Sequence, residues 1–235
     1  MLLLLALAGP ARAAEPVDLT LVLVSDVSRS VDDAEYRMQK AGYVAALNDP
    51  RVLAAIRGGA IGAIAIAYVE FAGSFEVNTV LDWQVVRDAA GARQMTDALD
   101  AAPRSYWGRT SISAGIDRAM LLLTENQFET QRRVIDVAGD GTNNSGRDVA
   151  AARDDAVAAG VTVNGLAIVN ENPVNSSFAH VQPPGGLTEW FRGNVIGGPG
   201  AFVMEVRAFE AFGEAITRKL INEIAQRPGD LPARL

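Results

Sequence analysis

Apolar residues along the chain fall into short runs that alternate with segments of helical spacing. Residues 17–25 read VDLTLVLVS, and a nearly continuous apolar run of this length is typical of a strand buried on both faces of a parallel sheet. Similar runs predict further strands at 60–71, 133–138, 161–169 and 201–206.

Helices are predicted between these strands, because apolar residues there recur every three or four positions. Asp32 precedes one such segment and Glu35 follows three residues later, which is the spacing of a capping box. The predicted helices cover residues 33–47, 50–57, 85–99, 112–124, 148–159 and 209–224.

The order of these elements indicates the fold class. Residues 75–80 alternate between apolar and polar side chains after the turn Gly73-Ser74, so we expect an antiparallel hairpin at one edge of the sheet. The other strands alternate with helices, which predicts a three-layer α/β/α, doubly wound and mostly parallel sheet. We expect one domain over 15–226, a long loop at 170–200 and a flexible tail at 227–235.

The first residues predict export. An apolar run within residues 1–14 is followed by the small-x-small pattern Ala11-Arg12-Ala13, as in a secretory signal peptide, although no basic residue precedes the leucines. A buried strand is the alternative. The run is too short to span a bilayer, and no second apolar stretch is long enough. We therefore expect no transmembrane anchor.

Composition narrows the classes of partner and site. The 235 residues include 49% hydrophobic and 21% charged ones, an ordinary balance for a globular domain. The formal net charge is −7, which argues against nucleic acid as a partner. The chain has no cysteine, so disulfides, thiolate metal sites and cysteine nucleophiles are excluded. Export without cysteine favours a bacterial periplasmic or secreted protein.

Oxygen-bearing side chains gather where the first strand ends. Asp26, Ser28 and Ser30 alternate just after it, Thr110 precedes the helix predicted at 112, and Asp140 follows the strand that ends at 138. Ligands of open α/β sheets bind at the carboxyl ends of the strands. The first segment offers one carboxylate and two hydroxyls, and the other two offer a hydroxyl and a carboxylate. These oxygen atoms are hard donors, which suit Mg²⁺ or Mn²⁺ and bind zinc poorly.

This pattern resembles the metal ion-dependent adhesion site (MIDAS) of von Willebrand factor type A (VWA) domains, and the resemblance covers about 17–225. It implies that Ser28, Ser30 and Thr110 bind the cation directly, and that Asp26 and Asp140 bind it directly or through water. It further implies Mg²⁺, with Mn²⁺ or Ca²⁺ as alternatives, and a protein partner that offers an Asp or Glu. Residues 133–137 and 194–200 are similar to a bacterial group of VWA-like domains of unknown function.

Two other interpretations of these residues remain open. Residues 139–144 read GDGTNN and resemble the last motif of haloacid dehalogenase-like phosphatases, in which Asp26 would be the nucleophile. Ser28 then stands where those enzymes need an acid/base carboxylate. The second alternative is a structural domain whose site is unused. We expect a binding protein and no catalytic residues.

Aromatic residues and one histidine accompany the candidate site. His180 is the only histidine, which excludes a multi-histidine metal site, and we expect no catalytic role for it. Tyr106 and Trp107 stand just before Thr110. They either form an exposed rim beside the metal or pack over the start of the helix.

Overall fold

The computed structural model describes residues 14–169 and 183–226. The predicted signal peptide at 1–14, except its last residue, lies outside this part of the chain, as do the predicted tail at 227–235 and His180.

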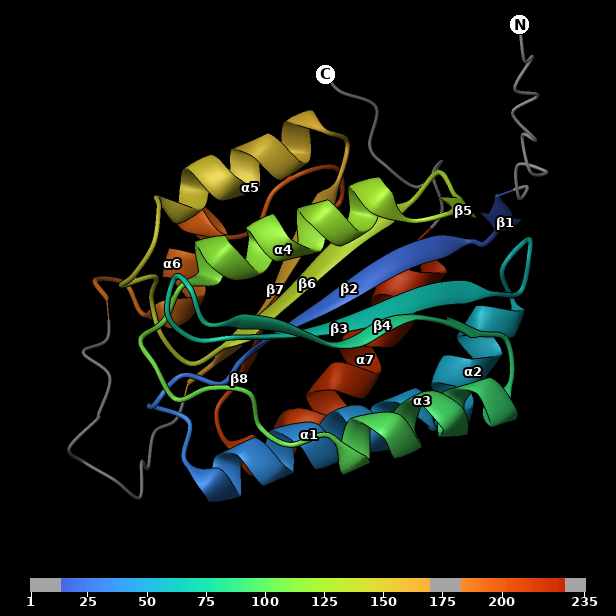
Figure 1. The fold of residues 1–235 in the computed structure, drawn as a ribbon, viewed down its shortest axis with the longest axis horizontal. Helices are drawn as coiled ribbons and strands as arrows, with labels where there is room; N and C mark the ends of the chain where they lie inside the picture. The colour runs from blue at the N-terminus through green and yellow to red at the C-terminus, as the bar shows by residue number, and fades with distance from the viewer. Residues whose placement is uncertain (1–13, 170–182, 227–235) are drawn as a thin grey trace, which may run out of the picture.

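Six strands form one sheet in the order β4-β3-β2-β6-β7-β8 (Figure 1). Only the pair β3 and β4 is antiparallel, and all other neighbours are parallel. This confirms the predicted mostly parallel sheet with an antiparallel edge strand. The strands are β2 (Leu19–Asp26), β3 (Ile64–Phe71), β4 (Val77–Val86), β6 (Arg133–Gly139), β7 (Thr162–Ile168) and β8 (Val203–Val206).

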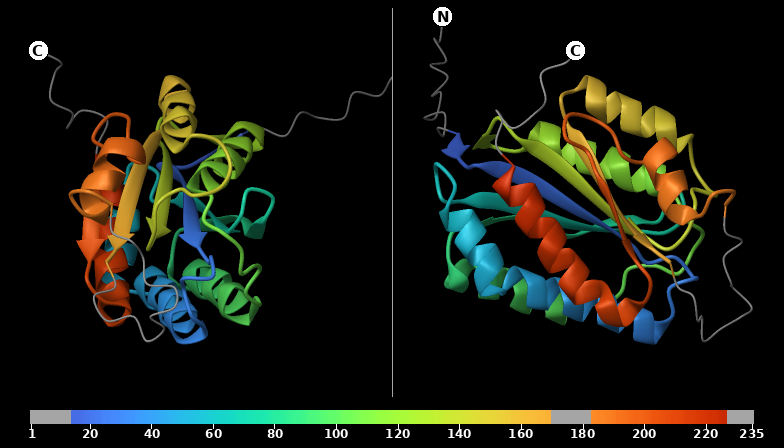
Figure 2. Two further views of the ribbon diagram at one scale, coloured as in Figure 1. Left: turned by 90° about the vertical axis from the view of Figure 1, so that its left-hand side faces the viewer. Right: turned by 180° about the vertical axis from the view of Figure 1, so that it is seen from behind.

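Helices cover both faces of the sheet, which makes three layers (Figures 1 and 2). On one face lie α1 (Asp33–Leu47), α2 (Pro50–Arg57), α3 (Ala89–Ala101) and α7 (Phe212–Ala225). On the other face lie α4 (Ile112–Glu125), α5 (Val149–Ala158) and α6 (Leu187–Asn194). None of the helices in the described ranges combines the length and the apolar character needed to cross a bilayer.

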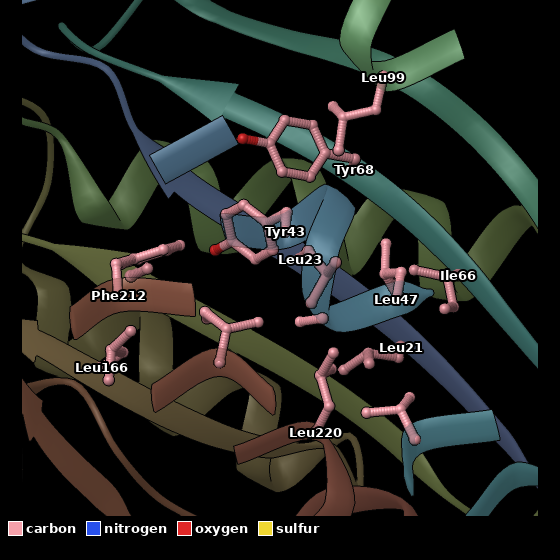
Figure 3. Packing of buried hydrophobic residues seen from close by; sticks show 14 of the residues in the cluster. Leu21, Leu23, Tyr43, Leu47, Ile66, Tyr68, Leu99, Leu166, Phe212 and Leu220 are labelled. Atoms are coloured by element: carbon pink, nitrogen blue, oxygen red, sulfur yellow. The ribbon is translucent and has the colours of Figure 1, made fainter. Parts of the chain in front are cut away.

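The alternation of side chains along β2 supplies both cores. Leu21 and Leu23 belong to the cluster under α1 and α7, whereas Val22 and Val24 belong to the cluster under α4. On the first face, Tyr43 contacts Tyr68 and Phe212 edge to face, at ring-centroid distances of 5.3 and 5.2 Å (Figure 3). Because β2 is buried on both faces, it fixes the position of the loop that follows it.

The start of α1 confirms the predicted capping box. Asp32 accepts hydrogen bonds from the backbone of Ala34 and Glu35 at 2.7 and 2.9 Å. The Glu35 carboxylate accepts from the backbone N–H of Asp32 at 2.8 Å. These contacts define where the loop after β2 ends and the helix begins.

Several predicted elements differ from the structure, among them the strand predicted at 60–71, which begins only at Ile64 as β3. β4 continues to Val86 because Val85 and Val86 pair with β3, so the helix predicted from residue 85 begins only at Ala89. The loop predicted at 170–200 contains α6, whose Leu187 and Phe191 are buried. The last predicted helix begins with a 3₁₀ turn, Phe209–Ala211, before α7.

A short parallel ladder lies beyond the amino end of β2, between β1 (Glu15–Pro16) and β5 (Phe128–Glu129). Pro16 lines a pocket there together with the end of α7, including Ile224 and Gln226. Arg132, just before β6, donates to the carbonyl of Ile224 at 3.1 Å. The described chain therefore begins and ends at the amino ends of the parallel strands.

A buried ionic cluster lies between α7 and the sheet. The Lys219 ammonium is 2.6 Å from a carboxylate oxygen of Asp136 and 2.6 Å from one of Glu223, and all three side chains are fully buried. Asn164 on β7 also donates to Glu223, at 2.8 Å. Burial and the nearby Asp136 raise the pKa of Glu223 to about 7, against the lowering effect of Lys219.

Candidate metal centre

The five predicted ligands come from three loops at the carboxyl ends of the parallel strands. β2 ends at Asp26 and leads into the loop of Ser28 and Ser30. β6 ends at Gly139, directly before Asp140, and Thr110 immediately precedes the N-cap of α4. Figure 2 (left) looks onto this end of the sheet.

The three hydroxyls and one carboxylate form a continuous chain of contacts. Thr110 Oγ1 donates to Ser28 Oγ at 3.1 Å, and Ser28 Oγ lies 3.1 Å from Ser30 Oγ. Ser30 Oγ donates to Asp140 Oδ1 at 3.0 Å. The structure therefore brings together side chains that are separated by up to 110 positions in the sequence.

Asp26 lies at the base of this group. Its Oδ1 accepts a hydrogen bond of 2.8 Å from the backbone N–H of Ser28, and its side chain is fully buried. Gly139 allows this placement, because a Cβ at that position would lie 3.2 Å from Asp26 Oδ2. All five predicted residues thus belong to one cluster.

One side of the cluster is open. Asp26, Ser28, Thr110 and Asp140 are each at most 3% exposed, whereas Ser30 is partly exposed. A ligand from outside can approach beside Ser30.

The donor set fits a hard divalent cation. It comprises two carboxylates and three hydroxyls, the oxygen ligands that Mg²⁺, Mn²⁺ and Ca²⁺ prefer. Within the described ranges, no three His, Cys, Asp or Glu side chains group in a way that could hold a metal. A site here depends on hydroxyl ligands, and the Ser28 hydroxyl already lies 3.1 Å from each of the other two.

Arg104 anchors the loop after β2. Its guanidinium donates to the carbonyls of Val27, Ser28 and Val31 at 2.9, 3.0 and 2.8 Å, and its side chain is only 4% exposed. The charge is balanced by Asp33 at 3.3 Å. Burial lowers the pKa of Arg104 despite this neighbour. Nothing in the local sequence indicated this role, since the contacts span more than 70 positions.

Two asparagines hold the loop that carries Thr110. Asn144 Oδ1 accepts from the backbone N–H of Thr110 at 3.0 Å, and the N–H of Asn144 donates to the carbonyl of Thr110 at 2.9 Å. Asn143 Oδ1 accepts from the N–H of Ser113 at 3.1 Å, in the first turn of α4. The end of the motif at 139–144 therefore joins the Asp140 and Thr110 loops.

Glu70, on β3, connects the loop before Thr110 with α1. Its carboxylate accepts from the Tyr36 hydroxyl and from the backbone N–H of Ser105, both at 2.9 Å, and it is 1% exposed. Burial and the adjacent Glu70 carboxylate raise the pKa of Tyr36, so the phenol remains a donor. Glu70 thus ties the loop before Thr110 to α1.

The two aromatic residues before Thr110 differ in their surroundings. Tyr106 is partly buried and packs against the core under α1. Trp107 is 58% exposed, and the Arg104 guanidinium lies 5.0 Å from the centre of its ring. Tyr106 therefore packs under α1 and not over the start of α4, which covers the other face of the sheet, whereas Trp107 is exposed.

Residues 16–228 match the family described as "Protein of unknown function (DUF1194)". The chain belongs to this family. No curated protein matches it.

Solved structures place this DUF1194 chain in the VWA fold. It is similar to proximal thread matrix protein 1 from the mussel byssus, whose structure has a zinc-occupied MIDAS motif, with 18% identity and a TM-score of 0.61 over 92% of this chain and 50% of that one. It is also similar to the von Willebrand factor type A structure from Catenulispora acidiphila, with 13% identity and a TM-score of 0.60 over 88% of this chain and 43% of that one.

The pilus adhesin SpaC from Lactobacillus rhamnosus GG is also similar, with 13% identity and a TM-score of 0.59 over 90% of this chain and 31% of that one. The chain spans half or less of the length of each of these three proteins. At such identities the similarity establishes the fold.

Proposed function

We propose that this DUF1194 domain binds a divalent cation through Asp26, Ser28, Ser30, Thr110 and Asp140, and uses it to bind a partner protein. The cation is Mg²⁺, with Mn²⁺ or Ca²⁺ as alternatives. The partner contributes an Asp or Glu carboxylate to the open coordination position. The domain acts in the bacterial cell envelope, in the periplasm or after secretion.

The contact chain from Thr110 through Ser28 and Ser30 to Asp140 carries this proposal. Hydroxyls from two separate loops, held at hydrogen-bonding distance beside two carboxylates, form a preorganised oxygen shell. A merely structural turn would need only local capping hydrogen bonds. The backbone anchors from Arg104 and Asn144 fix the loops on which these donors stand.

The composition of the shell supports binding of an external carboxylate. The proposed direct ligands Ser28, Ser30 and Thr110 are neutral hydroxyls. With Asp26 and Asp140 bound through water, a divalent cation would keep an electrophilic position for another carboxylate. Ser30, the most exposed member, marks the side from which that carboxylate enters. The adhesin and pilin relatives support the choice of a protein as the partner.

Calorimetric titration of the purified chain with MgCl₂, MnCl₂ and CaCl₂ tests the metal site. We expect binding by the wild type and none by Asp26→Ala or Ser28→Ala. Asp97→Ala is the matched control, since it removes an exposed carboxylate from α3 and leaves the site intact. Equal binding by the wild type, both site variants and the control would remove the metal site from the proposal.

Affinity capture from a bacterial periplasmic extract, in Mg²⁺ and again in chelator, tests the partner. We expect a protein retained only in Mg²⁺ and lost with Ser28→Ala. The phosphatase alternative makes a different prediction, namely turnover of a phosphate monoester that requires Asp26. Detection of that turnover would replace the binding proposal by an enzymatic one.

A further inference from the structure

Two aromatic side chains stand exposed on loops beside the proposed metal site. Four large hydrophobic residues are strongly exposed in the described ranges, and Phe75 and Trp107 are two of them, at 97% and 58%. Phe75 lies in the turn between β3 and β4, and Trp107 lies in the loop that leads to Thr110. Exposure of a phenylalanine to this degree stabilises nothing within the chain, so it points to a contact with another molecule.

The two aromatic loops belong to one surface. The Glu76 carboxylate, beside Phe75, accepts from the backbone N–H of Gly73 at 2.9 Å. It also fills the space next to Gly108, beside Trp107, where any Cβ would collide with it. Contacts within the chain therefore hold the Phe75 turn against the Trp107 loop.

The same surface adjoins the proposed ligands. The N–H of Arg29, between Ser28 and Ser30, donates to the carbonyl of Gly108 at 3.0 Å. The N–H of Ser74 donates to the Ser145 hydroxyl at 3.3 Å, which joins the Phe75 turn to the loop after Asp140. Aromatic rings, basic side chains and metal ligands thus share one end of the molecule.

Two arginines add positive charge beside the two carboxylates of the proposed site. Arg29 and Arg109 are both exposed next to the cluster, whereas the chain carries a formal net charge of −7. Asp33, an exposed carboxylate in the first turn of α1, pairs with Arg104. A negatively charged segment is therefore favoured here over a positively charged one.

We propose that the partner segment is an acidic peptide stretch with an aromatic or large aliphatic residue beside its metal-binding carboxylate. This inference rests on the proposed function and adds the chemistry of the partner. The apolar residue packs against Phe75 and Trp107, and a second acidic group pairs with Arg29 and Arg109. The aromatic contact excludes water around the carboxylate and separates such partners from acidic segments that lack an apolar residue.

An array of immobilised heptapeptides tests the inference directly. One pool has a central Glu with Phe, Trp or Leu next to it, a second has a central Glu flanked by Ser, Gly and Asp, and a third replaces the Glu of the first pool by Gln. The labelled full chain is applied in MgCl₂ and in chelator. The variants are Phe75→Ser, Trp107→Ser, Ser28→Ala and the control Leu121→Ser. The control removes a 51% exposed apolar residue from α4.

We expect metal-dependent binding of the wild type to the first pool to exceed its binding to the second about tenfold. Binding to the first pool should fall about tenfold in Phe75→Ser and in Trp107→Ser, and should be unchanged in Leu121→Ser. Metal-dependent binding that is equal for the first two pools, or unaffected by both aromatic substitutions, would overturn this inference and leave the proposed function standing. Loss of any difference between Glu and Gln pools would overturn the proposed function itself. Metal-independent binding of the wild type to phosphatidylglycerol vesicles, abolished by Phe75→Ser, would assign the aromatic residues to a membrane surface instead.

Discussion

The guanidinium of Arg104 donates a hydrogen bond of 3.0 Å to the carbonyl of Ser28, although the two residues are 76 positions apart. Ser28 is the central hydroxyl of the proposed shell, because it contacts both Thr110 and Ser30. A buried cation from one loop thus fixes the backbone of another loop that is proposed to bind metal. Two of the predictions below follow from such anchors, which touch no ligand atom.

Arg104→Ala should destabilise the chain and weaken cation binding. The substitution removes the hydrogen bonds that Arg104 donates to three backbone carbonyls in the largely buried loop after β2. We therefore expect a loss of about 3 kcal/mol in the free energy of unfolding. Cation affinity should fall about tenfold or more. Urea unfolding and calorimetry measure the two effects, and Arg104→Lys, which keeps the charge without the planar fork, should lie between.

Asn144→Ala should weaken the site with a smaller effect on the fold. Thr110 would lose the acceptor for its backbone N–H, which costs about 1 kcal/mol of unfolding free energy. We expect a cation affinity about tenfold lower, because the Thr110 hydroxyl is no longer held against Ser28. Asn78→Ala is the control, since Asn78 is exposed and its side-chain amide donates to the Ser105 hydroxyl at 3.0 Å, away from the five proposed ligands. An unchanged affinity for Asn144→Ala would show that the loop holds its shape without this contact.

Gly146→Ala should destabilise the loop after Asp140. Gly146 has a φ of +80°, and a Cβ there would lie 2.4 Å from the Ser111 hydroxyl. We expect a loss of about 2 kcal/mol in the free energy of unfolding, from backbone strain and the displaced N-cap of α4. Gly193→Ala provides the comparison, because a Cβ at that helical position meets no atom within 4 Å. Thermal unfolding of both variants is sufficient, and equal melting temperatures would contradict the expectation.

The stability of the chain should depend on pH through Glu223. Its pKa is raised from 4.5 to about 7 in the folded state by burial and Asp136, so the folded state holds a proton that the unfolded state releases. The resulting stabilisation is complete below pH 4.5 and is lost as the pH rises through about 7. Groups that face Glu223 include Asp136, Lys219 and the buried Tyr43.

Glu223→Gln isolates this effect, because the amide keeps the shape of the side chain and does not titrate. We expect the free energy of unfolding of the wild type to fall relative to that of the variant between about pH 5 and pH 8. Urea unfolding at a series of pH values measures the difference. Parallel curves for the two proteins would show that Glu223 is ionised throughout this range.

Much of the fold could be predicted from the sequence, because β2, β3, β6 and β7 are buried on both faces and their apolar runs are nearly continuous. The capping box at Asp32 is local and was equally visible. β4 was predicted too short, since its last residues look helical in isolation and become a strand only by pairing with β3. α6 was missed among glycines and prolines, although Leu187, Phe191 and Val195 have the spacing of four that indicates a helix.

The candidate site was predictable in its members but not in its support. Asp26, Ser28 and Ser30 alternate in one segment, and Thr110 and Asp140 stand at the ends of predicted elements. The contacts of Arg104, Glu70 and Asn144 depend on how distant loops meet, which no local pattern records. The buried Lys219 was missed for a related reason, because a charged residue on a helix normally indicates a solvent-exposed face.

The ladder of β1 and β5 and the end of α7 lie together at the end of the sheet opposite the Asp26 cluster. Residues 14 and 226, the two ends of the described range, therefore lie at one pole, and the proposed binding surface lies at the other. An anchor or a neighbouring domain joined near residue 14 or residue 226 would lie at the opposite end of the sheet from the Phe75 and Trp107 surface. That surface would then face away from the attachment. A pull between such an attachment and a bound partner would load the sheet along its strands and pass through the loops of the binding surface.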